Sequence, residues 1–166
     1  MKKKIFLNLT INKNNRINRF IQGKVDFISD AYSNINNDHN TNGEYWIQQK
    51  AIELGFKVFF DVGANKGEWS RNLLSLSNYI RVYAFEPNPE VFFQLKELPY
   101  FGRIIASQIA LADSEGEEEF SINLSNSIFS SFFSRSDFID SKTVKVEKRR
   151  GDKYCELQNI GPIDFL

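Results

Sequence analysis

The order of apolar and polar residues is most informative in one segment, where a strand, a glycine loop and a helix follow one another. Val58 to Phe60 is a short β-branched and aromatic run without helical periodicity, which is typical of a strand buried on both faces. Asp61 follows at the carboxyl end of this strand, just before the glycines. Apolar residues then recur at i, i+4 and i+7, at Trp69, Leu73 and Leu76, and predict an amphipathic helix from about Glu68 to Leu76. This is the order of the first half of a nucleotide-binding βαβ unit.

A second strand and helix follow in the same order. Arg81 to Phe85 is predicted to be the next strand, and it ends at an acidic residue, Glu86. Two prolines then stop the strand, and Asn88 before Pro89 predicts the N-cap and the first residue of a helix. That helix is expected to bury Val91, Leu95 and Leu98.

An earlier helix is predicted from its capping signals. Thr41 and Glu44 have the spacing of a capping box, so the helix is expected to start with Thr41 as its N-cap and to end at Gly55. Its buried face is expected to consist of Ile47, Ala51 and Leu54. Tyr45 and Trp46 are interpreted as core residues rather than ligand contacts.

The C-terminal half predicts further strands. Arg103 to Leu111 is expected to be a third buried strand. A half-buried strand follows, in which Phe120, Ile122 and Leu124 alternate with polar residues. Lys142 to Glu147 is expected to be an exposed strand, and Lys148 to Arg150 a solvated basic turn. Strands that alternate with helices in this way predict an α/β fold with a doubly wound, mostly parallel sheet.

Two segments lack a clear period. Residues 1–41 are rich in Asn and Lys and are expected to form a loosely attached extension or, alternatively, a lid over the substrate. His39, the only histidine, lies there and is expected to be a solvated loop residue rather than a catalytic base. The Ser- and Phe-rich residues 125–136 are expected either to pack over the sheet edge or to present aromatic rings to a substrate.

Composition narrows the classes of function. The chain has 166 residues with 21 basic and 21 acidic side chains, so no net charge draws it toward nucleic acid or an anionic membrane. A single cysteine, Cys155, excludes a disulfide framework within the chain and favours a reducing, cytoplasmic setting. No apolar run predicts a signal peptide or a membrane span of roughly 20 residues. No cluster of His, Cys and acidic residues has the spacing of a metal site.

The glycine loop limits the kind of nucleotide. A dinucleotide-binding loop has the pattern Gly-x-Gly-x-x-Gly, whose second glycine lets the backbone approach a pyrophosphate. Here the loop runs Gly63, Ala64, Asn65, Lys66, Gly67, with a side chain in place of that glycine. Glu86 lies about 20 residues further on, where a carboxylate can accept hydrogen bonds from ribose hydroxyls. The combination predicts a nucleoside with a small polar tail, such as S-adenosylmethionine (SAM).

Three segments, in this order and spacing, resemble the FkbM-type SAM-dependent methyltransferases: Asp61 to Gly67, Ala84 to Pro89 and Ala110 to Gly116. The resemblance covers roughly residues 42–166, so we expect a SAM-binding methyltransferase domain there and an extension at residues 1–41. It implies a Rossmann-like class I methyltransferase fold. It also implies O-methylation of a hydroxyl on a sugar or other secondary metabolite, with a small-molecule or glycan acceptor as the partner.

The expected cofactor contacts follow from the loop and the resemblance together. Asp61 is expected to bind the ammonium of the methionine tail, and the backbone of Gly63, Ala64, Asn65 and Gly67 to hold the methionine end. The N-terminus of the following helix is expected to hold the methionine carboxylate, and Glu86 the ribose. The resemblance implies that Ala110, with Leu111 beside it, lies against the adenine. No catalytic residue is assigned.

The last residues of the chain carry a further expectation. Lys153 to about Gln158 is predicted to be a short helix, and Ile163 to Leu166 the start of a fourth strand beside the first. The family commonly has Thr-Leu-Asp before that helix, whereas this chain has Arg150-Gly-Asp152 and matches only the Asp. We expect the chain to be truncated in the fourth strand, with the acceptor site beyond Leu166. Two alternatives stay open: a nicotinamide-dependent oxidoreductase, and a truncated, non-catalytic fragment that binds a nucleoside.

Overall fold

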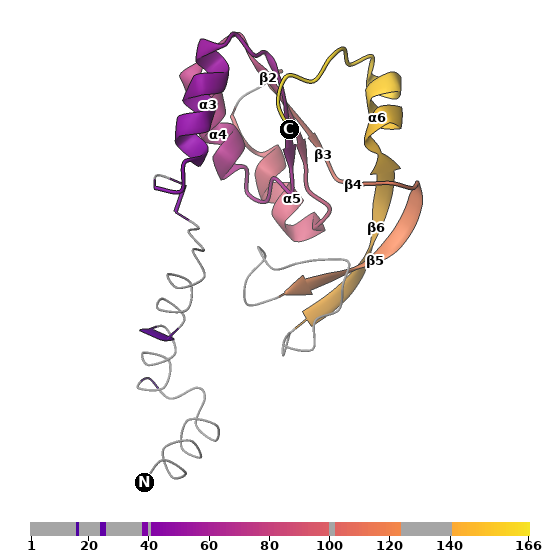
Figure 1. Ribbon diagram of the computed structural model, residues 1–166. Coiled ribbons are helices and arrows are strands. Elements are labelled where there is room, and N and C mark those ends of the chain that lie inside the picture. The colour runs from indigo at the N-terminus through magenta and orange to yellow at the C-terminus, as the bar shows by residue number, and fades with distance from the viewer. Residues whose placement is uncertain (1–15, 17–23, 26–37, 40, 100–101, 124–140) are drawn as a thin grey trace. The chain divides into compact units, whose positions relative to one another are not determined.

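The computed structural model describes residues 16, 24–25, 38–39, 41–99, 102–123 and 141–166 (Figure 1). The chain divides into two compact units, Met1–Glu44 and Tyr45–Leu166. The Ser- and Phe-rich residues 125–136 and most of residues 1–41 lie outside the described residues. What we expected of them, including the domain boundary after residue 41, therefore stays a prediction.

The second unit contains a parallel sheet at its centre, with the strand order β1-β2-β3. These strands are β1 (Val58–Val62), β2 (Arg81–Phe85) and β3 (Ile104–Ser107). Asp61 pairs in register with Ala84, so the carboxyl ends of β1 and β2 lie at the same edge of the sheet. The predicted first and second strands are confirmed, and both are apolar because helices cover both of their faces.

The far side of β1 carries the last residues of the chain. Phe165 forms a parallel bridge with Phe59, and the Phe60 N–H donates to the Phe165 carbonyl at 2.9 Å. Asp164 accepts hydrogen bonds from the Lys57 and Val58 amides at 2.8 and 2.9 Å. The predicted position of this segment, beside the first strand, is confirmed.

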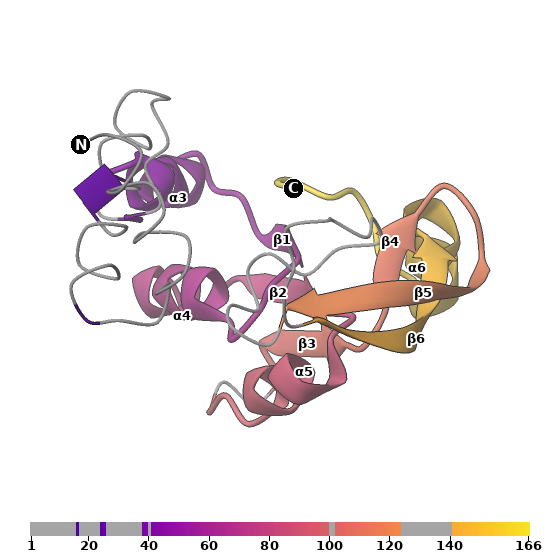
Figure 2. The same cartoon turned by 90° about the horizontal axis from the view of Figure 1, so that it is seen from below.

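Helices cover both faces of the parallel sheet, as the doubly wound prediction requires (Figures 1 and 2). On one face, α3 (Glu44–Glu53), α4 (Glu68–Leu76) and α5 (Pro89–Lys96) pack against side chains that include Phe59, Val82 and Ala84. On the other face, Tyr154 of α6 (Gly151–Gln158) packs against Phe60, Tyr83 and Phe85. Among the described residues, none of the helices has the length and apolar character needed to cross a membrane.

The predicted third strand is wrong in one respect, because Arg103 to Leu111 forms two strands and not one. After β3 the chain leaves the first sheet at Gln108, and Ile109 packs into the cluster around Phe85. Residues Ala110–Ala112 then form β4 in a second sheet, ordered β4-β6-β5. An unbroken apolar run does not reveal this change of sheet, which depends on pairing with a distant strand.

The second sheet also corrects the predicted basic turn. Lys148 to Arg150 are the last residues of β6 (Ser141–Arg150), where they pair with β4. On its other side, β6 runs antiparallel to β5 (Gly116–Asn123). The positive charges are tolerated in a strand because acidic neighbours face them: Lys148 Nζ lies 2.5 Å from Glu118 Oε2, and Arg150 pairs with Asp152.

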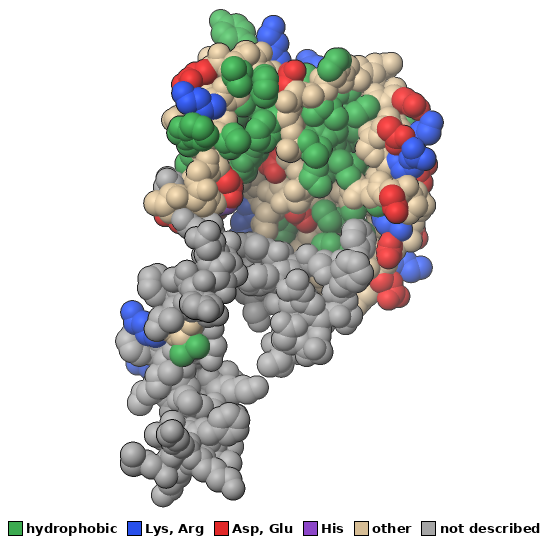
Figure 3. All heavy atoms as spheres, in the orientation of Figure 1, with side chains coloured by type: hydrophobic (Ala, Val, Ile, Leu, Met, Phe, Trp, Pro, Cys, Tyr) green, Lys and Arg blue, Asp and Glu red, His purple; other side chains and the backbone are tan. Residues whose placement is uncertain are grey.

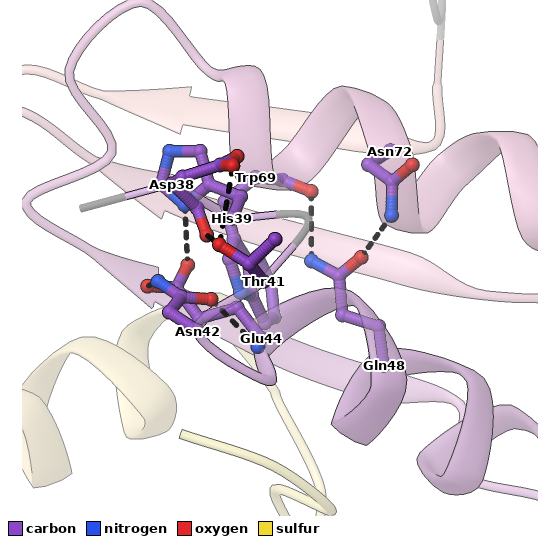
Figure 4. A network of polar contacts seen from close by, with 8 residues as sticks. All are labelled: Asp38, His39, Thr41, Asn42, Glu44, Gln48, Trp69 and Asn72. Carbon is purple, nitrogen blue, oxygen red and sulfur yellow. Dashed lines mark hydrogen bonds and ion pairs between the residues drawn. The ribbon is translucent and has the colours of Figure 1, made fainter. Parts of the chain in front are cut away.

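The start of α3 differs from the predicted capping box. The helix begins at Glu44, and the Asn42 side-chain oxygen accepts from the Glu44 N–H at 2.9 Å (Figure 4). The predicted cap by Thr41 is wrong, because the Glu44 amide donates to Asn42, while the Thr41 hydroxyl donates to Asp38. By contrast, Asn88 caps α5 as predicted, with its side chain accepting from the Glu90 N–H at 3.0 Å.

The buried face of α3 also differs from the prediction. Ala51 is buried, but Ile47 and Leu54 are 42% and 72% exposed, and Trp46, expected in the core, is 61% exposed. A polar residue, Gln48, is buried in their place. Gln48 donates to the Trp69 carbonyl at 3.0 Å and accepts from Asn72 Nδ2 at 2.5 Å (Figure 4). These two bonds join α3 to α4 and offset the cost of burying an amide.

Candidate functional site

Two acidic side chains stand at neighbouring strand ends of the parallel sheet. Asp61 is the next to last residue of β1, and Glu86 directly follows β2. Their strands pair in register from Val58 with Arg81 to Val62 with Phe85, which brings both side chains to one edge. Ligands of open parallel sheets bind outside this carboxyl edge. The candidate site is therefore built from this edge and the loop that follows β1.

The loop after β1 is held by the end of β2. The amides of Gly63 and Ala64 both donate to the Phe85 carbonyl, at 2.9 and 3.0 Å. Ala64 is 6% exposed and packs with Leu95 of α5. Three loop residues have left-handed backbones, namely Gly63 (φ 78°), Asn65 (φ 48°) and Gly67 (φ 76°). The loop thus has a defined shape that depends on its glycines.

The two terminal glycines of the loop have different surroundings. A Cβ at Gly67 would lie 2.7 Å from Leu95 Cδ1 and 2.6 Å from Leu98 Cδ1, so this glycine lets the loop pack against the α5 region. A Cβ at Gly63 would meet nothing within 4 Å. Gly63, unlike Gly67, therefore packs against no other part of the chain on this side, and its role is limited to the left-handed backbone.

The Glu86 carboxylate connects the loop to the start of α5. It is 6% exposed, and its Oε2 and Oε1 atoms accept from the amides of Asn65 and Asn88, both at 2.8 Å. Burial raises the pKa of Glu86; the two amide hydrogen bonds lower it, and the nearby charge of Asp61 raises it, with a net increase. Glu86 thus shapes the loop, in addition to any contact with a ligand.

Asp61 has a partner that the sequence analysis missed. The Ser70 hydroxyl of α4 donates to Asp61 Oδ2 at 2.6 Å, and Ser70 is 0% exposed. The sequence predicts an apolar stripe of Trp69, Leu73 and Leu76 on α4. In the structure the buried residues of α4 are Ser70, Leu73 and Leu74. A serine on the buried face of an amphipathic helix is the signal that could have indicated a polar partner.

The start of α4 faces the same edge. Gly67 is its N-cap and supplies no side-chain hydrogen bond, while the Arg71 amide donates to the Gly67 carbonyl at 2.8 Å. Glu68, an exposed acid, occupies the first turn, where a negative charge interacts favourably with the helix dipole. The binding of a methionine carboxylate at this helix end stays a prediction, and Glu68 would compete with it electrostatically.

The structure brings the loop residues and Glu86 together, and it places Ala110 on a different sheet. Ala110 is buried in β4, which belongs to the second sheet and not to the sheet of Asp61 and Glu86. Its expected role against the adenine stays a prediction. His39 of the first unit pairs with Glu44 at 2.8 Å. In the described part of the chain, no group of His, Cys and acidic residues is arranged to hold a metal ion.

Comparison with known proteins gives one family. Residues 61–166, from Asp61 onward, match the family model described as the Methyltransferase FkbM domain. The sequence has no match among curated proteins. The matched stretch includes every candidate cofactor residue named above.

Two solved structures illustrate the likeness. The FkbM methyltransferase from Methylobacillus flagellatus KT is similar with a TM-score of 0.38 and 15% identity, over 59% of this chain and 22% of that chain. The plantazolicin methyltransferase BpumL, solved with a monoazolic desmethylPZN analog and SAH, has a TM-score of 0.36 and 9% identity, over 57% of this chain and 35% of that chain. This chain thus spans well under half of either relative.

Proposed function

This chain belongs to the FkbM methyltransferase family, whose model matches residues 61–166, and from this premise we propose that it binds SAM and transfers the methyl group to a hydroxyl of a sugar or other secondary metabolite. The observation that carries the proposal is the buried Glu86 carboxylate, which lies at the strand end next to the glycine loop and accepts from the Asn65 amide.

Two acidic side chains at this edge are suited to two parts of SAM, the ribose and the amino-acid tail. Each carboxylate oxygen has two lone pairs, so Glu86 can accept from ribose hydroxyls while it keeps its bonds to Asn65 and Asn88. Asp61 offers a negative charge to the ammonium of the methionine tail. Gly63 has no neighbour within 4 Å on its Cβ side, so its backbone would be accessible to the ligand.

When bound, SAM supplies an electrophilic methyl group on a sulfonium. The contribution of this chain is to bind and orient it, because a fixed position relative to the acceptor lowers the entropic part of the barrier. Glu86 would hold the ribose and Asp61 the amino-acid tail, so two contacts from this chain would fix the position of the bound cofactor. No group in the chain is assigned as the base that takes the acceptor proton.

Isothermal titration of the whole chain with S-adenosylhomocysteine (SAH) tests the cofactor assignment. We expect SAH to bind with a micromolar dissociation constant, which is a binding free energy of about 8 kcal/mol. NADH, the ligand expected for a nicotinamide-dependent oxidoreductase, should not bind. Glu86→Gln places an N–H₂ donor against two amide donors, so we expect SAH binding to weaken by about tenfold or more. Glu119→Gln changes an exposed acid of β5 and should leave SAH binding unchanged. The assignment would be contradicted by a folded chain that binds no SAH, or by a Glu86→Gln variant whose SAH affinity equals that of the wild type.

A turnover assay tests the proposed reaction. SAM is incubated with the chain and a panel of glycosides and hydroxylated metabolites, and SAH and methylated product are measured by mass spectrometry. The proposal expects SAH to form only with an acceptor and the added methyl group to reside on oxygen. Binding of SAM without turnover of any acceptor would favour the non-catalytic alternative.

A further inference from the structure

Ser70 has no assigned role, yet it is the buried partner of Asp61 in the structure. Its hydroxyl lies 2.6 Å from Asp61 Oδ2, and the side chain is 0% exposed. We propose that Ser70 is a positioning residue that holds the Asp61 carboxylate for the ammonium group of the bound amino-acid tail. The inference rests on the proposed function, because it assigns one residue to one end of the SAM site.

The hydrogen bond of Ser70 is unusual for a serine inside a helix. Such serines ordinarily donate to a carbonyl three or four residues earlier. Ser75 on the same helix does this, since its hydroxyl donates to the Asn72 carbonyl at 2.6 Å. Ser70 instead donates across to a carboxylate of β1, nine residues earlier in the chain. Within one helix, therefore, Ser75 makes a local backbone contact and Ser70 makes a contact to a residue of the candidate site.

The turn of α4 that carries Ser70 is itself fixed. Gln48 of α3 is 1% exposed and donates to the Trp69 carbonyl, directly before Ser70, at 3.0 Å (Figure 4). Leu73 and Leu74, on the same face as Ser70, are 0% and 1% exposed. Because this turn is buried and hydrogen-bonded to α3, the Ser70 hydroxyl is a positioned donor that helps to orient the Asp61 carboxylate.

The charges around Asp61 indicate why a hydrogen-bond donor is needed there. Asp61 stands near a second carboxylate, Glu86, and the charge of each disfavours the charge of the other. A hydrogen bond donated to a carboxylate favours its ionised form. Ser70 therefore supplies a donor that orients Asp61, and its effect should be limited to ligands that carry an ammonium.

Two ligands separate this role from a merely structural one. SAH has the adenosine, the sulfur and the amino-acid tail, whereas 5′-methylthioadenosine has the first two and lacks the tail. For Ser70→Ala we expect the SAH affinity to fall by about tenfold and the 5′-methylthioadenosine affinity to stay as in the wild type. Ser70→Cys, similar in size but a weak donor, should show the same selective loss. Ser70→Thr, which keeps the hydroxyl, should restore SAH binding.

The controls use the full chain and titration calorimetry throughout. Ser75→Ala removes a hydroxyl from the same helix and should change neither affinity. In an Asp61→Asn background, Ser70→Ala should cause little further loss of SAH affinity, because the two residues act as a unit. Equal losses for both ligands, or an unchanged SAH affinity in folded Ser70→Ala and Ser70→Cys, would overturn the inference while leaving the proposed function intact. A wild-type chain that binds no SAH would overturn both.

Discussion

The two sheets of this chain differ in how they treat polar groups. In the parallel sheet, strand side chains such as Phe59, Val82 and Phe85 are 0% exposed. The carboxylate that follows β2, Glu86, is buried and bonded to backbone amides. In the second sheet the buried cluster is small, formed by Phe120, Ile122 and Val146 with Val144 packed against it. Most of the remaining side chains there are charged.

This contrast indicates where a ligand can be recognised with a defined geometry. Acidic and basic side chains are interspersed on the side of the domain where β6 and α6 lie (Figure 3). Pairs such as Arg149 with Glu147 and Lys153 with Glu156 are about one-third to two-thirds exposed, and water and salt screen them. Buried groups at the end of the parallel sheet keep fixed partners. We therefore propose that the SAM site lies there, and four predictions test the contrast.

The largest effect is expected from the core of the parallel sheet. Phe59→Ala removes a ring that packs with Phe165 at a centroid distance of 5.9 Å and with helices α3 and α4. We expect the free energy of unfolding to fall by about 3–5 kcal/mol. Phe120→Ala in the second sheet should cost clearly less, because its cluster is smaller. Urea unfolding of both variants gives the comparison, and equal losses would contradict it.

The next effect concerns the glycine loop. Gly67→Ala places a side chain on a left-handed backbone, which costs about 1 kcal/mol of stability. The added methyl group also collides with the buried Leu95, which costs about 1–3 kcal/mol more. The expected loss in the free energy of unfolding is about 2–4 kcal/mol in total. Gly63→Ala is the matched control, because its φ is 78° but its Cβ meets nothing within 4 Å. It should show only the backbone part, and an equal loss in both variants would contradict the packing argument.

A smaller effect distinguishes two exposed carboxylates by pH and salt. Amide hydrogen bonds from Lys57 and Val58 lower the pKa of Asp164, whereas the Arg150 side chain lowers the pKa of Asp152. Each carboxylate therefore stabilises the fold above its unfolded pKa, near 3.8, and loses this contribution as the pH falls through the lower folded value.

The matched variants are Asp164→Asn and Asp152→Asn, compared with the wild type in thermal melts from pH 7 to pH 2. Both variants should melt below the wild type at pH 7, and both differences should shrink toward pH 2. Added salt should reduce the Asp152→Asn difference and leave the Asp164→Asn difference, because salt screens an exposed ion pair. The opposite salt response would show that the two carboxylates are held in other ways.

The smallest effect is expected from the ion pair of the second sheet. Lys148 and Glu118 approach within 2.5 Å, with side chains 17% and 47% exposed. A double-mutant cycle with Lys148→Ala and Glu118→Ala should give a coupling below about 1 kcal/mol. This coupling should decrease in high salt. A coupling as large as the Phe59→Ala effect would remove the distinction between the two sheets.

The sequence predicted those parts of the fold whose signals are local. The bounds of α4, Glu68–Leu76, follow from an apolar stripe after a glycine loop. The start of α5 follows from Asn88 and Pro89, because a cap and a first-turn proline act within a few residues. Asp61 and Glu86 were identified by their positions at strand ends, and the structure brings both to one edge.

The parts that the sequence did not predict depend on distant partners. The division of residues 103–111 into β3 and β4 depends on pairing with β6, more than 30 residues later. The buried face of α3 depends on Gln48 reaching α4, and an apolar stripe does not reveal a buried amide. Ser70 was missed for the same reason, since its partner, Asp61, lies on another element.

An amide chemical-shift titration of the ¹⁵N-labelled chain with SAH tests where the SAM site lies. If the site lies at the carboxyl edge of the parallel sheet, the amides of Gly63, Asn65 and Gly67 shift in proportion to the bound fraction. Those of Glu118 and Glu119 in β5 then stay in place. Shifts confined to the second sheet would contradict this location. So would the absence of shifts in a folded chain at millimolar SAH, because a binding free energy of about 4 kcal/mol would already be detected there.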